Sequence, residues 1–117
     1  MIFNFLNQIK NIANEFSPNA TIDYKIVRAT HLYFRITINE DTLIDIYFNP
    51  DTERKDLSLI YKNERIYGFD NLKGWHYHPY KEPGKHISCE EPDVGDVLKE
   101  MKKIVEGLGR EFKVNLE

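Results

Sequence analysis

A chain of 117 residues has the length of one domain and is long enough to bury one core, so we expect a single domain over residues 1–117. Hydrophobic residues make up 41% and charged residues 30%, which excludes a disordered protein, and a net charge of −3 argues against one that coats nucleic acid generally. A lone Cys89, no signal-like N-terminus and no apolar run of membrane-spanning length predict a cytoplasmic protein with no membrane partner.

The first expected element is an amphipathic helix over residues 5–16. Its apolar residues recur at intervals of three and four, which places them on one helical stripe. They are Phe5, Leu6, Ile9, Ile12, Ala13 and Phe16. Asn4 can cap the start of the helix, and the run Ser17-Pro18-Asn19 ends it.

From residue 22 the apolar residues recur with a period of two, which predicts strands with one buried and one wet face. The alternating segments cover residues 22–29, 32–38, 44–48, 57–61 and 66–69. Polar turns at residues 39–42 and 62–65 predict hairpins between neighbouring segments. The wet face would carry Tyr33, Arg35, Thr37, Asp45 and Tyr47, which is either ordinary surface or a shallow binding platform.

Residues 70–91 are rich in Gly, Pro and His, and they predict a long loop before a final helix. Pro92 suits the first turn of that helix, and Gly107 and Gly109 predict its end. Residues 112–116 would form a short terminal strand or a tail. The expected fold is therefore α+β, with an N-terminal helix, an antiparallel β-meander of four or five strands, a His-rich loop and a C-terminal helix packed on one face of the sheet.

The loop concentrates the side chains that can do chemistry. Three of the four histidines, His76, His78 and His86, fall within eleven residues. Lysines at positions 73, 81 and 85 make the stretch locally basic, and Trp75 is the only tryptophan. Polar and aromatic side chains gathered on one loop are typical of a functional site.

One interpretation of the loop is metal-independent cleavage of RNA. Imidazole titrates near neutral pH, so one histidine can deprotonate a ribose 2′-hydroxyl while another protonates the leaving oxygen. A lysine or Arg35 would stabilise the charge on the phosphoryl oxygens, and Trp75, Tyr77 or Tyr80 could stack on a base. Asp70, at the end of the last strand, could orient an imidazole.

Two other interpretations remain open on the residues alone. His76, His78 and His86 could bind a divalent metal ion, because an H-x-H pair on an extended strand places both imidazoles on one side. The loop could also be structural, with Trp75 and Pro79 packing it down and the histidines in solvent. His31 and Cys89 are expected to have structural roles.

From about residue 22 to residue 105 the chain resembles the TumE family of toxin–antitoxin proteins. The motifs that carry the resemblance run in order along the chain. They are Phe69-Asp70-Asn71 at a strand end, His76-Tyr77-His78-Pro79, Lys85-His86, and Glu91-Pro92-Asp93-Val94 at the start of the last helix. The chain departs from the family pattern after Asp70-Asn71, where Leu72 to Trp75 stand, and before Lys85, where Pro83-Gly84 stand.

The resemblance implies a toxin component held by a cognate antitoxin protein. Joined to the chemistry of the loop, it leads us to expect a small His-dependent endoribonuclease that needs no cofactor. His86 and His76 would be the acid–base pair, with Asp70 as an orienting group. Lys85, Lys73, Arg35, Trp75 and Tyr80 would contact RNA. A divalent metal on the three histidines, a non-catalytic binding module and a homodimer remain open alternatives.

Overall fold

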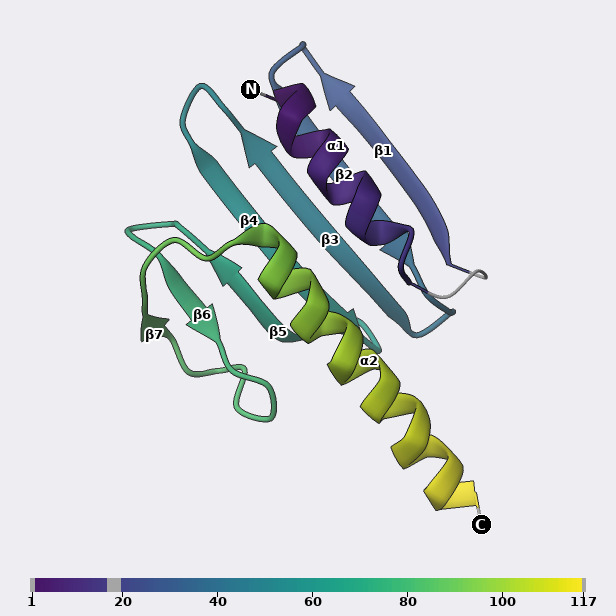
Figure 1. Ribbon diagram of the computed structural model, residues 1–117. Coiled ribbons are helices and arrows are strands. Elements are labelled where there is room, and N and C mark those ends of the chain that lie inside the picture. Colours follow the sequence, from purple (N-terminus) through teal and green to yellow (C-terminus); the bar gives the residue numbers. More distant parts are fainter. Residues whose placement is uncertain (1, 17–19, 117) are drawn as a thin grey trace.

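The computed structural model describes the backbone of residues 2–16 and 20–116, and the side chains of 2–16 and 20–108. Two helices flank a run of strands along the chain (Figure 1). The elements are α1 (Ile2–Ala13), β1 (Thr21–Val27), β2 (His31–Thr37), β3 (Thr42–Asn49), β4 (Arg54–Tyr61), β5 (Glu64–Asp70), β6 (His76–His78), β7 (Ile87–Ser88) and α2 (Val94–Leu116). The expected α+β class is confirmed.

The strands form one antiparallel sheet in which each strand pairs with the next along the chain, in the order β1 to β7. The register places Phe34 of β2 opposite Ile46 of β3, which in turn lies opposite Leu57 of β4. Alternate residues of one strand point to opposite faces, so these three side chains share a face. The meander is therefore held in register by one continuous apolar row.

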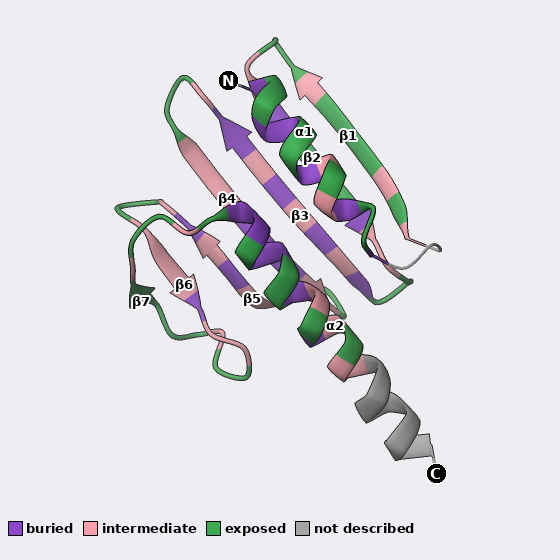
Figure 2. Ribbon diagram, in the orientation of Figure 1, coloured by how far each residue is buried: buried purple, intermediate pink, exposed green. Residues whose placement is uncertain are grey.

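Both helices cover that apolar face and leave the other open (Figure 1, Figure 2). The helices contribute their predicted apolar stripes, and β2, β3 and β4 contribute the alternate residues of each strand. The buried core consists of Ile2, Phe5, Leu6, Ile9, Ala13, Phe16, Leu32, Phe34, Ile36, Ile44, Ile46, Phe48, Leu57, Leu59, Val94, Val97, Leu98, Met101 and Ile104. Among the described residues, no helix is long and apolar enough to cross a membrane.

The opposite face of the sheet, called the open face below, carries polar rows. One row crosses five strand pairings, through Asp23, Arg35, Asp45, Ser58, Gly68 and His78. The next row runs through Tyr33, Tyr47, Asp56, Asp70 and His76. The wet face expected from the sequence and the His-rich segment are thus parts of one surface.

The prediction of four or five strands is too low, because the described residues form seven. The two additional strands, β6 and β7, lie inside the segment that was expected to be a loop. They are three and two residues long, too short to show a periodic pattern, and His, Tyr and Pro obscure what pattern exists.

The helix boundaries also differ from those expected. Helix α1 begins at Ile2 and ends at Ala13, a few residues earlier than the sequence indicated. Helix α2 continues through Gly107 and Gly109 to Leu116, so the expected terminal strand over residues 112–116 is wrong. A glycine permits the end of a helix without enforcing it, since its cost in a helix interior is only about 1 kcal/mol.

Candidate functional site

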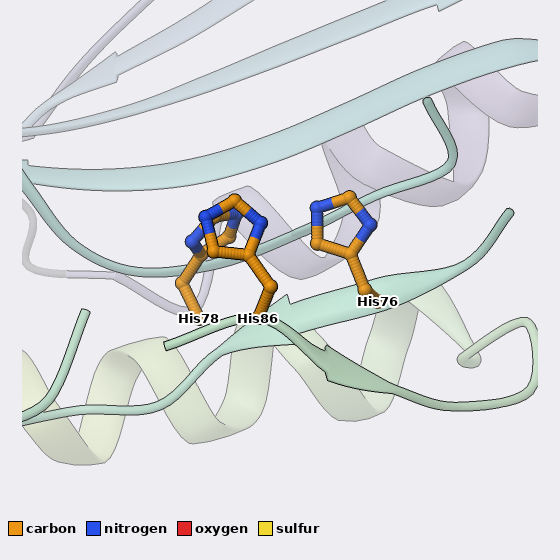
Figure 3. A group of neighbouring side chains, drawn as sticks. All are labelled: His76, His78 and His86. Carbon is orange, nitrogen blue, oxygen red and sulfur yellow. The ribbon is translucent and has the colours of Figure 1, made fainter. Parts of the chain in front are cut away.

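Strands β5 and β6 bring Asp70, His76 and His78 together on the open face. Asp70 is the Cα partner of His76, and Gly68 is the partner of His78. Because the two histidines stand two positions apart on the strand, both imidazoles project from the same side of β6. Figure 3 shows the side chains rising from this strand on the side away from α2. A glycine opposite His78 adds no side chain to that face, which leaves space for the imidazole.

The segment between β6 and β7 folds back and adds His86 to the pair. Two successive turns shape it, in which the amide of Glu82 donates to the carbonyl of Pro79 (3.2 Å) and the amide of Lys85 donates to that of Glu82 (3.0 Å). The ring centroid of His86 then lies 4.5 Å from that of His78 and 5.0 Å from that of His76. The sequence alone could not show this convergence. The three imidazoles are called the histidine cluster below.

The carboxylate of Asp70 lies at the base of the histidine cluster. Its side chain is nearly buried, and its Oδ2 is 3.2 Å from Nε2 of His76 and 3.4 Å from Nε2 of His78. The guanidinium of Arg65 reaches the same oxygen at 3.3 Å, and the amide of Leu72 donates to Oδ1 at 3.0 Å. A buried carboxylate needs such partners, because an unpaired one would not remain charged.

These partners decide the protonation of Asp70. Burial raises the pKa of the carboxyl group, but the Leu72 amide, the imidazoles of His78 and His76, and Arg65 outweigh burial and hold the pKa below its ordinary value. Asp70 is therefore an anion at neutral pH, in contact with three groups that can carry positive charge.

The second nitrogen of each strand imidazole is also engaged. Nδ1 of His76 is 3.2 Å from the carbonyl oxygen of Gly74, and Nδ1 of His78 is 3.0 Å from that of Pro83. A carbonyl oxygen can only accept, so both Nδ1 atoms carry protons. The ionised carboxylate of Asp70 also only accepts. The Nε2 atoms that face it therefore require a proton or another cation between nitrogen and oxygen.

Within the part of the chain whose side chains are described, the histidine cluster is a group that could hold a metal ion. One ligand nitrogen from each of His76, His78 and His86 lies within 4.8 Å of the other two. Around a tetrahedral zinc ion with Zn–N bonds of about 2.0–2.1 Å, ligand nitrogens lie about 3.4 Å apart. The cluster thus offers a metal-ligand set whose nitrogens would have to approach one another by at most about 1.4 Å on binding.

The two lysines expected to contact RNA lie in exposed loops beside the cluster. Lys85 precedes His86, and its Nζ is 2.8 Å from the carboxylate of Glu82. Lys73 has a positive φ of 60° in the turn between β5 and β6. Both side chains are exposed, so neither ammonium group pays a large desolvation cost to meet a phosphate.

Trp75 lies on the other side of the sheet from the histidine cluster. It packs against the core and lines a small hollow on the helix side, with Phe5 and Val94. The expected stacking of a base on Trp75 beside the imidazoles does not fit this position. The cause is strand parity, since residues 75 and 77 of the β6 region point opposite to 76 and 78. Tyr80 also packs against the core, as a half-buried side chain.

Arg35 lies on the open face, but on β2 rather than beside the cluster. Its Nε and one terminal nitrogen bind the carboxylate of Asp45 at 2.7 and 2.9 Å. The hydrogen bond to Asp45, together with the charges of Asp45 and Asp23, raises the pKa of the guanidinium. Arg35 is thus already paired, and a phosphate would have to compete with Asp45 for it.

A hollow of about 670 Å³ lies on the open face over β1 to β4. Its lining mixes aromatic residues with charges of both signs. The charged and aromatic side chains that lie on this face are Asp23, Lys25, Tyr33, Arg35, Asp45, Tyr47, Arg54 and Asp56. The rings of Tyr33 and Tyr47 are tilted against each other at 5.1 Å. The surface for which a shallow binding platform was one of two interpretations is therefore hollowed.

Sequence reasoning missed the role of Arg65, which reaches Asp70 from the start of β5. The residue directly follows a polar hairpin turn, where an arginine is ordinary. Only the fold shows that the carboxylate five residues later is within its reach. Asp56, the Cα partner of Asp70, was likewise not singled out, nor was Ser58, whose hydroxyl donates to Asp56 at 2.7 Å.

Comparisons of the chain with models of protein families, with curated proteins and with solved structures give no significant match. The resemblance to the TumE family consequently rests on the sequence motifs. What the histidine cluster does is argued below from its geometry and chemistry.

Proposed function

We propose that the protein is a TumE-like toxin that cleaves RNA, with the histidine cluster as its reaction centre. The observation that carries the proposal is the convergence of His76, His78 and His86 over the Asp70 carboxylate, on the open face of the sheet. Groups that titrate near neutral pH are suited to general acid–base catalysis when they lie close together.

The roles follow from exposure and hydrogen bonding. His86 is exposed, and its ring lies against the other two imidazoles, so it is the general base that removes the proton of a ribose 2′-hydroxyl. The 2′-oxygen then attacks phosphorus, and the bond from phosphorus to the 5′-oxygen breaks. His76 is the general acid that gives a proton to that departing oxygen, through a ring nitrogen that leaves its contact with Asp70 or Gly74 when RNA binds. The products are a 2′,3′-cyclic phosphate and a 5′-hydroxyl end.

Asp70 is a positioning residue in this scheme. Its Oδ2 lies within hydrogen-bonding distance of Nε2 of His76 and of His78, and so it fixes the orientation of both imidazoles. Lys85, next to His86 in an exposed turn, is placed to contact a non-bridging phosphoryl oxygen. A partner antitoxin would silence the toxin by covering the open face around the cluster.

A second function is favoured by a specific feature, the proton on each strand Nδ1. Metal-binding histidines commonly donate the second ring N–H to a backbone carbonyl, as His76 and His78 do to Gly74 and Pro83. This leaves two Nε2 lone pairs and the Asp70 carboxylate facing one another, and a divalent cation would satisfy all three. The alternative is therefore a metal-binding module without catalysis.

One assay separates the ribonuclease from the metal-binding module. Purified protein is incubated with single-stranded RNA, with and without EDTA, and the new ends are identified. Cleavage that persists in EDTA and leaves 2′,3′-cyclic phosphates supports the acid–base centre. Metal bound in stoichiometric amount by a protein that leaves RNA intact supports the binding module and contradicts the proposed ribonuclease.

A further inference from the structure

The two edges of the sheet differ in how well they are protected. The edge at β7 is only two residues long, a length that gives a second chain little to pair with. The edge at β1 is seven residues long, and its pairing with β2 runs without a bulge from Thr21 to Val27. Among the described residues, no further strand pairs with β1. A long regular edge of this kind is a template for another strand.

The side chains of β1 alternate between the two faces. Ile22, Tyr24 and Ile26 point to the helix side, where Lys10 of α1 donates a hydrogen bond to the Tyr24 hydroxyl (3.0 Å). Asp23 and Lys25 point to the open face. The side chains of Tyr24 and Val27 are exposed although they are large and apolar. The edge therefore presents apolar surface and one charge of each sign.

We propose that β1 pairs with β1 of a second copy of this chain, antiparallel, about a two-fold axis at Tyr24. In this register residue numbers across the axis sum to 48, which is twice the number of the central residue. Asp23 then lies opposite Lys25 of the second copy, and Ile22 lies opposite Ile26 of the second copy. Opposite charges and β-branched residues in directly opposed positions both stabilise antiparallel pairs.

The charges select this register over its neighbours. Moving the axis to Asp23 places that carboxylate opposite its own copy, and moving it to Lys25 does the same for the ammonium group. Like charges directly opposite each other destabilise a sheet. A lone lysine on an edge normally discourages pairing. Here Asp23, two residues away, lets the same lysine favour one partner, a second copy of β1.

The dimer would be a continuous sheet with all four helices on one side, because residues that oppose each other across the axis share a face. The open faces of the two copies would join, and the hollow lined by Asp23 and Lys25 would lie beside the axis. The two histidine clusters would be roughly 50 Å apart, since they lie eleven strand spacings from each other. This inference does not depend on the proposed ribonuclease activity.

The test uses two charge reversals and their mixture. In the Lys25→Asp protein each copy sets Asp23 against an aspartate, and in the Asp23→Lys protein each copy sets Lys25 against a lysine. A heterodimer of the two variants restores an opposite-charge pair at both positions. Association is measured by sedimentation equilibrium of the full chain over a range of concentrations, with circular dichroism to verify that each variant is folded.

We expect wild type to dimerise, each variant alone to associate at least about tenfold more weakly, and the equimolar mixture to recover the wild-type constant. A wild type that stays monomeric at every concentration overturns the proposal. So does a variant that dimerises as tightly as wild type, because the interface would then lie elsewhere. Salt should weaken the wild-type dimer and strengthen the homodimer of each variant.

Discussion

The two faces of the sheet are built from the same strands but obey different rules. On the helix side most of the alternate residues of β2, β3 and β4 are aliphatic or phenylalanine, and α1 and α2 cover them (Figure 2). On the open face the intervening residues include many charged and aromatic side chains, and two rows lead from the hollow over β1 to β4 to the histidine cluster. One face thus supplies stability, and the other is free to carry chemistry.

The contrast is sharpest at Asp70 and His78, which lie on the open face and yet are each only 5% exposed. His78 contacts the Pro83 carbonyl and the ring of His86, and Asp70 lies beneath His76 and His78, so a buried polar site forms without helices above it. This is a costly arrangement unless every polar atom finds a partner. The contacts of Asp70 with Arg65, His76, His78 and Leu72 provide those partners.

The largest difference in stability should appear between alanine substitutions of two neighbouring residues that point to opposite faces of the sheet. Phe34 is 2% exposed on the helix side, and Tyr33 beside it is 43% exposed on the open face. We expect Phe34→Ala to lower the free energy of unfolding by about 3–5 kcal/mol, and Tyr33→Ala to lower it by less than about 1 kcal/mol. Urea denaturation measures both. Equal losses in the two variants would contradict the division of roles between the faces.

A smaller effect is expected from the buried carboxylate. Asp70→Ala leaves the Leu72 amide without its acceptor and Arg65 without its ion pair, which should cost about 1–3 kcal/mol. The matched control is Asp45→Ala, which removes an exposed ion pair with Arg35 and should cost about 0–1 kcal/mol. If the control costs as much as Asp70→Ala in the same denaturation experiment, Asp70 is not the organising residue of the site.

The sequence could predict the parts of the molecule that periodicity controls. The stripes of α1 and α2 and the alternation in β1 to β5 follow from where apolar residues recur, and the covered face was predicted from them. Strands β6 and β7 escaped because a strand of three residues offers no period to detect. Helix α2 passed its expected end because glycine only weakens a helix.

The candidate site could be predicted in its members but not in its arrangement. The density of His76, His78 and His86 in one segment marked the site, and strand parity predicted that the first two share a side. The approach of His86 depends on the turns between Pro79 and Lys85, which no local rule fixes. Trp75 was assigned to the site by proximity in sequence, whereas parity would have placed it on the helix side.

The smallest expected effect is a difference between wild type and Asp70→Asn in how stability falls with pH. The pKa of Asp70 is lower in the folded protein than its ordinary value of 3.8, so the unfolded chain takes up a proton first as the pH falls. The stabilisation from Asp70 is therefore complete above that value and is lost as the pH falls through the folded pKa. Asp70→Asn, which cannot titrate, should lose less stability than wild type between neutral and acidic pH, as followed by urea midpoints. Equal losses of stability in Asp70→Asn and in wild type would contradict a lowered pKa of Asp70 in the folded protein.

We propose the histidine cluster as the reaction centre of a ribonuclease, and cleavage of single-stranded RNA by two histidine variants tests this role most directly. His86→Ala removes the proposed base, and His31→Ala is the matched control, because His31 lies away from the cluster and hydrogen-bonds Asn49 at 3.0 Å. We expect His86→Ala to lose about 100-fold or more in rate, in the presence of EDTA, and His31→Ala to cleave as wild type does. Equal cleavage by His86→Ala and wild type would contradict the claim.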